Sequence, residues 1–77
     1  MKTFYFTYGS NHEDDVGQSL GNCYTPIEAN NVTEATRLMF NTRGAKWSHC
    51  YNSKEAAGVS KYHLQERLLS EVWIKHD

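Results

Sequence analysis

A strand-like aromatic segment covers residues 2–8 and stops at Gly9-Ser10-Asn11-His12. The junction places a glycine turn, a small hydroxyl and an imidazole directly after a strand. Backbone amides in such a turn can hold a phosphate group, and an imidazole can carry positive charge near neutral pH. The junction is therefore our first candidate for a functional site, and its residue types suit a small polar ligand.

Aromatic and basic side chains elsewhere in the chain supply the rest of a predicted pocket. A strand predicted over residues 45–51 alternates so that Trp47, His49 and Tyr51 share one face. Aromatic faces stack on planar bases, and a basic side chain nearby would attract an anionic group. The predicted ligand-binding residues are Thr7, Tyr8, Gly9, Ser10, His12, Arg37, Lys46, Trp47 and Tyr51.

Catalysis is the weaker interpretation of these residues. Cys50 lies beside His49 as a nucleophile would lie beside its base, but neighbouring side chains in a strand point to opposite faces. His12 is close to Asp14 and Asp15 in the sequence, but all three lie in a predicted loop, where sequence spacing alone fixes no catalytic geometry. We therefore predict that the protein is not an enzyme.

Metal binding and a disulfide are also disfavoured by spacing. Cys23 and Cys50 contain no CxxC motif, and a zinc site that combined them with His12 and His49 would need adjacent strand residues to converge. The acidic run 13–15 lacks the alternating oxygen ligands of a calcium loop. We expect free thiols that pack in the core, and we predict no metal and no cofactor.

Length and charge limit the classes of function. The 77 residues predict one domain over 1–77, small enough that self-association is an open alternative for added stability. With 8 basic and 9 acidic residues, the net charge of -1 disfavours general nucleic-acid binding and anionic membranes. We found no secretory leader pattern and no apolar run of bilayer-spanning length, so we expect a cytoplasmic protein.

The elements that must position the site predict a small α+β fold. Asn31 followed by Glu34 resembles a capping box, and Gly44 is suited to ending the helix. Between them the helix would turn an apolar stripe inward, formed by Val32, Ala35, Leu38 and Met39. We predict a single-layer antiparallel sheet of three to four strands, at 2–8, 22–29, 45–51 and 62–67, on one helix at 32–43, with a helical turn at 53–57 that begins after Asn52.

Two segments leave alternatives open. Pro26 has no N–H to donate, which favours an edge position or an irregular stretch within residues 22–29. Residues 59–77 combine a helical period with local alternation at 62–66, so either a helix or a strand fits. The apolar segment 72–74 would pack as a last strand or lie at an interface.

Several short motifs occur in an order that resembles a known group of proteins. They are Thr7-Tyr8-Gly9-Ser10-Asn11-His12, Ala35 with Leu38-Met39-Phe40, Lys46-Trp47 with Tyr51, and Ala57-Gly58-Val59 before Tyr62-His63-Leu64. The set resembles a family of short, mostly uncharacterised proteins of tailed phages and prophages, and it covers most of residues 4–66. Where members commonly carry arginine after the helix alanine, this chain has Thr36, and Arg37 follows one position later.

The resemblance implies a biological context. Small phage proteins of this size often act by stoichiometric binding in the host cytosol. It implies a non-catalytic protein that counters host defence by sequestering a nucleotide-derived signal. The alternative is a direct protein inhibitor of a host defence enzyme, acting through an exposed sheet edge and the Trp73 tail.

Overall fold

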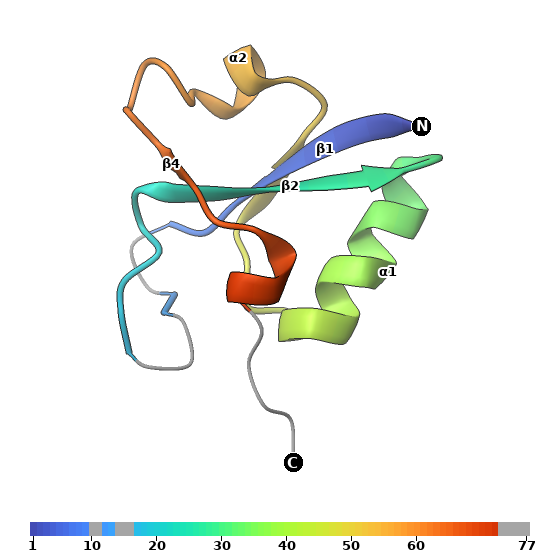
Figure 1. The fold of residues 1–77 in the computed structure, drawn as a ribbon, viewed down its shortest axis with the longest axis horizontal. Helices are drawn as coiled ribbons and strands as arrows, with labels where there is room; N and C mark the ends of the chain where they lie inside the picture. Colours follow the sequence, from blue (N-terminus) through green and yellow to red (C-terminus); the bar gives the residue numbers. More distant parts are fainter. Residues whose placement is uncertain (10–11, 14–16, 73–77) are drawn as a thin grey trace.

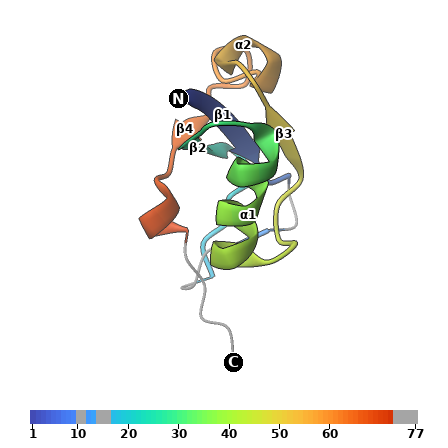
Figure 2. The same cartoon turned by 90° about the vertical axis from the view of Figure 1, so that its right-hand side faces the viewer.

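The computed structural model describes residues 1–9, 12–13 and 17–72. The elements, in chain order, are β1 (Lys2–Thr7), β2 (Cys23–Ala29), α1 (Val32–Arg43), β3 (His49–Tyr51), α2 (Lys54–Ala57), β4 (Gln65–Glu66) and the 3-10 helix η1 (Leu69–Glu71). The strands form one sheet in the order β3-β1-β2-β4. Helices α1 and α2 lie on opposite sides of the strands (Figure 1, Figure 2). The predicted α+β class is confirmed.

The core lies between the sheet and α1. β1 and β2 pair antiparallel, with Phe4 opposite Ile27 and Phe6 opposite Thr25. Because side chains alternate along a strand, this register turns the large apolar residues of both strands to the same face. That face packs on α1 and on parts of the loops, and the buried cluster is Phe4, Phe6, Tyr8, Leu20, Cys23, Ile27, Ala29, Ala35, Met39 and Val72.

Both ends of α1 follow the predicted capping. The side chain of Asn31 accepts a hydrogen bond from the N–H of Glu34 at 2.9 Å, which satisfies one of the free donors at the helix start. At the other end Gly44, with φ 63°, donates its N–H to the carbonyl oxygen of Phe40 at 2.7 Å. The helix therefore begins and ends where its sequence predicts.

The predicted inner stripe of α1 is only partly right. Ala35 and Met39 are fully buried, whereas Val32 is 50% and Leu38 38% exposed. The buried face continues instead through Thr42 and Arg43 in the last turn. A polar side chain can be buried there because it is satisfied: the Thr42 hydroxyl donates to the carbonyl oxygen of Leu38 at 2.9 Å.

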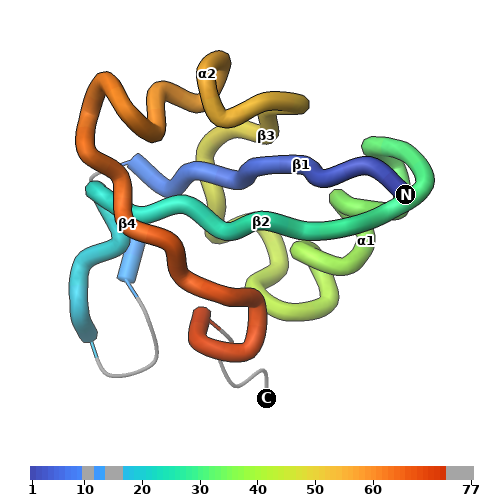
Figure 3. The backbone as a smooth tube through the Cα atoms, turned by 45° about the horizontal axis from the view of Figure 1, so that its top comes forward, coloured from blue at the N-terminus to red at the C-terminus, as the bar shows by residue number. Residues whose placement is uncertain are grey.

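The sheet is mixed, not wholly antiparallel as predicted. β4 runs parallel to β2, with Cys23 opposite Gln65 and Tyr24 opposite Glu66, and it crosses the end of β2 in Figure 3. A parallel neighbour requires a crossover, which residues 30–64 provide through α1, β3 and α2. The predicted strand at 62–67 is correspondingly shortened to two residues.

Pro26 lies in the part of β2 beyond its pairing with β4. The carbonyl oxygens of Asn22 and Tyr24 accept from β4 and the residue after it, so even-numbered residues of β2 direct their backbone groups to that side. Pro26 follows the same alternation, but β4 pairs only with residues 23 and 24. Its missing N–H therefore lies on the open side, as expected for proline at a strand edge.

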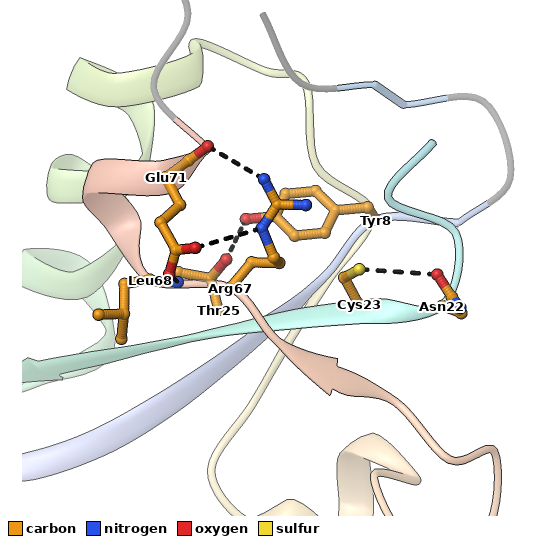
Figure 4. Close-up of polar contacts among 7 residues, drawn as sticks. All are labelled: Tyr8, Asn22, Cys23, Thr25, Arg67, Leu68 and Glu71. Carbon is orange, nitrogen blue, oxygen red and sulfur yellow. Dashed lines mark hydrogen bonds and ion pairs between the residues drawn. The ribbon is translucent and has the colours of Figure 1, made fainter. Parts of the chain in front are cut away.

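Within the described residues, the chain after β4 forms neither the predicted amphipathic helix nor a last strand. Residues 69–71 form the 3-10 helix η1, and Arg67 lies beside Glu71 with 3.7 Å between Nε and Oε2 (Figure 4). Val72 then enters the core with no exposed surface. The predicted role of Trp73 and Ile74 lies outside the described residues.

Candidate ligand-binding site

A pocket of 320 Å³ lies at the end of β1, on the side of the sheet that α2 covers. We call it the strand-end pocket. Its walls come from β1, β3, α2, the turn before β2 and the segment before β4. The described residues that line it are Thr7, Gly9, Gly21, Asn22, Ser48, His49, Tyr51, Ala57, Tyr62 and Leu64.

Three of the predicted site residues line this pocket. Thr7 is the last residue of β1, Gly9 comes two residues after it, and Tyr51 belongs to the neighbouring strand β3. Gly9 has φ 68°, and a Cβ there would meet only Ser48, at an ordinary 3.7 Å. Glycine at this position is therefore explained by the backbone turn and not by crowding.

An aromatic pair forms one wall of the pocket. His49 and Tyr51 lie two residues apart on β3, with ring centroids 5.9 Å apart and an interplanar angle of 30°. The hydroxyl of Ser48 lies 2.9 Å from Nδ1 of His49. That contact orients the imidazole and leaves Nε2 as the ring nitrogen for a ligand.

Trp47 does not share this wall, and the prediction that it lies on the face of Tyr51 is wrong. The ordered strand begins only at His49, so the predicted alternation over residues 45–51 does not hold. Trp47 packs edge to face on Phe6, with centroids 5.1 Å apart, beside the core. Its burial serves the core, which is the commonest use of a large aromatic side chain in a small domain.

Tyr8 is likewise an interior residue. It is 1% exposed, and its hydroxyl shares a hydrogen bond with the hydroxyl of Thr25 (Figure 4). Burial raises the pKa of Tyr8 to about 12, and the hydrogen bond to Thr25 and the positive charge of Arg43 oppose that rise. A neutral, enclosed phenol of this kind does not contact the strand-end pocket.

The remaining predicted site residues that the structure describes lie apart from the pocket lining. Arg37 is exposed on α1, and Lys46 is exposed in the turn after that helix. His12 is partly buried, and its carbonyl oxygen accepts from the N–H of Leu20 at 2.9 Å. Ser10 lies outside the described residues. The predicted positive charge of Arg37 or Lys46 is therefore absent from this lining.

A second, larger pocket of 580 Å³ lies at the start of α1, and we call it the helix-start pocket. Tyr51 lines both pockets. The carboxamides of Asn30 and Asn31 also border the helix-start pocket, but both already interact with Glu34 of α1. Lys2 and Asn52 line this pocket as well, so it offers a cation and further polar groups, whereas the strand-end pocket has more ring and hydroxyl groups.

The comparisons with known proteins add no identity. No family model matches the chain, and no curated protein or solved structure matches it. The phage resemblance consequently stays a hypothesis from the motifs. Within the described residues, no three His, Cys, Asp or Glu side chains gather as metal ligands would. In the same part of the chain, no helix has the length and apolar character needed to cross a membrane.

Sequence reasoning missed the far wall of the pocket. Tyr62 and Leu64 were assigned to a strand, and Asn22 to the start of another. The predicted alternation places His49 correctly on the face of Tyr51, although His49 is not among the predicted ligand-binding residues. Alternation along β3 could have identified His49 as a site residue. The position of Tyr62 depends on a loop conformation that sequence periodicity does not predict.

Proposed function

We propose that this protein is a phage-encoded, non-catalytic binding protein that counters host defence in the host cytosol. Its ligand would be a nucleotide-derived signal, sequestered in the strand-end pocket. The observation that supports this most is the composition of the lining: three ring side chains, His49, Tyr51 and Tyr62, surround hydroxyl and amide groups. None of the described lining residues carries a carboxylate that would repel a phosphate.

The size of the pocket suits a single nucleotide unit. Ligand pockets in proteins commonly enclose about 300–1,000 Å³, and the strand-end pocket has 320 Å³. A base with its sugar can occupy that space, with the hydroxyls of Thr7 and Ser48 and the amide of Asn22 available for hydrogen bonds. A larger signal would have to extend past Tyr51 toward the helix-start pocket.

Two pairs of adjacent residues, Ser48 with His49 and Cys50 with His49, resemble catalytic dyads. Both pairs lack the features that would activate a nucleophile. Ser48 contacts His49, yet both are exposed, and no described carboxylate lines the pocket to orient the imidazole. Cys50 pairs opposite Phe6 on the core side of the sheet. Burial raises the pKa of the Cys50 thiol, which disfavours the reactive thiolate.

A thermal-shift screen against cyclic and linear nucleotides tests the proposal. A ligand held at 100 times its Kd would stabilise the fold by about 2.7 kcal/mol, which should raise Tm by roughly 10 °C or more. The shift should be lost in His49→Ala and kept in Arg37→Ala, which changes an exposed side chain outside the pocket lining. The absence of a shift with every nucleotide would refute nucleotide sequestration.

A direct protein inhibitor is the second candidate, because α1 presents an exposed ring. Phe40 is 59% exposed, and Arg37 lies one turn before it on the same helix. Large aromatic and arginine side chains are common anchors of protein interfaces. Phe40→Ser should abolish capture of a host defence enzyme, and mass measurement in solution would show whether a second copy of the chain uses this surface instead.

A further inference from the structure

The position of the Tyr62 ring depends on the absence of a side chain at residue 58. Its ring is 63% exposed. A Cβ built on Gly58 would lie 2.6 Å from Cδ2 and 2.7 Å from Cε2 of that ring, closer than real Cβ contacts. The ring therefore occupies the space that any other residue at position 58 would need for its side chain.

The backbone around this contact is tied at several points. Gly58, with φ 74°, ends α2 and donates its N–H to the carbonyl oxygens of Glu55 and Lys54. Tyr62 donates back to the carbonyl oxygen of Gly58 at 2.9 Å, and Leu64 donates to that of Val59 at 2.9 Å. α2 itself is anchored by buried Ala57. The backbone that carries Tyr62 is thus ordered before any ligand arrives, which lowers the conformational entropy lost on binding.

The side chains around Tyr62 suit a ligand in which a planar ring is joined to an anionic group. Nζ of Lys61 lies 5.3 Å from the centre of the Tyr62 ring. His49 and Tyr51 line the same pocket from β3. Because Nζ of Lys61 lies over one face of the ring, a base would stack on the opposite face. An exposed aromatic ring, a cation and further rings in the same lining are the components with which proteins bind single bases.

We propose that Tyr62, whose ring occupies the space left open by Gly58, is the residue on which the base of the ligand stacks in the strand-end pocket. This proposal rests on the proposed function and specifies which part of the nucleotide is recognised. The ligand class is a planar heteroaromatic ring joined to an anionic group. Lys61 interacts with that anionic group.

The experiment measures binding of AMP, adenosine and ribose 5-phosphate by calorimetry, and follows the Tyr62 ring signals by NMR. AMP should bind more tightly than ribose 5-phosphate and should shift the Tyr62 signals. Because stacking on one aromatic side chain commonly changes affinity roughly five- to a hundredfold, Tyr62→Ala should weaken AMP binding by a factor in that range. Tyr62→Phe keeps the ring and should stay within about twofold of the unmodified protein.

Gly58→Ala supplies the decisive variant, because it leaves Tyr62 in the chain but removes the space its ring occupies. It should weaken AMP binding about as much as Tyr62→Ala. Gly17→Ala is the matched control: Gly17 also has a positive φ, of 84°, but its Cβ would meet only Oε2 of Glu13 at 3.5 Å, and Gly17 does not line the pocket. Circular dichroism and melting curves establish that each variant is folded.

The outcomes separate this inference from the proposed function. If AMP binds equally to the unmodified protein, Tyr62→Ala and Gly58→Ala, the nucleotide function stands and stacking on Tyr62 is refuted. If adenosine shifts the Tyr62 signals but no nucleotide phosphate binds, the stacking inference stands and nucleotide sequestration is refuted. If neither AMP nor adenosine binds, both are refuted.

Discussion

The guanidinium carbon of Arg43 lies 5.1 Å from the centre of the Tyr8 ring, and both side chains are buried. The same guanidinium donates hydrogen bonds to three main-chain carbonyl oxygens, those of Lys46 at 2.8 Å, Val72 at 2.9 Å and Glu13 at 2.7 Å. These acceptors belong to the turn after α1, the segment after η1 and the loop after β1. Arg43 therefore connects three segments that share no strand pairing.

Replacement of buried Arg43 should destabilise the protein more than replacement of an exposed residue of α1. Arg43→Met would fill much of the volume but would leave three carbonyl oxygens without their donor, so we expect a loss of about 3 kcal/mol or more in the free energy of unfolding. That is a large part of what so small a domain can have. Urea denaturation would measure it, and Arg37→Met on the exposed face of α1 should change stability by about 0.5 kcal/mol or less. Equal effects of the two variants would contradict this account.

Stability should fall at high pH because Tyr8 resists ionisation in the fold. Burial raises the pKa of Tyr8 from 10.0 to about 12, so between these values the unfolded chain releases a proton that the folded chain keeps. The contribution is present in full below pH 10 and is lost as the pH rises through 12, by about 2 to 3 kcal/mol in total. Tyr8→Phe should flatten this part of the pH profile, whereas Tyr62→Phe should not. The profile would be measured by chemical denaturation at each pH, and identical slopes in all three proteins would refute the assignment to Tyr8.

The start of α1 should depend on one side chain. Asn31→Ala removes the acceptor for the N–H of Glu34 and should cost about 1 kcal/mol, which corresponds to a Tm decrease of roughly 4–8 °C in a domain of this size. Asn41→Ala changes an exposed asparagine of the same helix and should leave Tm unchanged or slightly raised, since alanine favours helix. Differential scanning calorimetry would compare the two, and an unchanged Tm in Asn31→Ala would contradict the capping role.

Pro26 should protect the open side of β2 from pairing with another chain. Pro26→Val restores an N–H on that side and raises strand propensity, so we expect concentration-dependent self-association. Glu28→Gln removes a charge from the same strand without adding a backbone donor, and it serves as the control. Sedimentation velocity over a range of concentrations would reveal the association. A Pro26→Val protein that stays at the same mass as the unmodified protein would contradict the prediction.

The parts of the fold that local chemistry determines could be predicted from the sequence. Alternation in residues 2–8 and 22–29 placed β1 and β2, and Asn31 and Gly44 placed the ends of α1. The direction of β4 could not be predicted in this way, because pairing between Cys23 and Gln65 depends on how the whole crossover packs. The second helical turn was found, but its N-cap is Ser53 and not Asn52, a difference of one residue that propensity does not resolve.

The candidate site could be predicted only where a strand defined it. Thr7, Gly9 and Tyr51 come together because β1 and β3 are neighbours. Trp47 was misplaced because β3 is shorter than its alternation suggests, so its side chain follows the turn and reaches Phe6. Tyr62 could not be predicted as a site residue, because its ring lies over the space left open by Gly58 in a turn that no periodicity indicates.

The parallel pairing of β4 affects the stage of folding at which the pocket is completed. Leu64, which lines the pocket, directly precedes β4, and β4 pairs with Cys23 and Tyr24 across a long stretch of chain that contains α1, β3 and α2. Contacts that close so long a stretch of chain form late in folding. The pocket lining would therefore be completed late in folding, so ligand binding would report on the native fold and not on intermediates in which only β1 and β2 have paired.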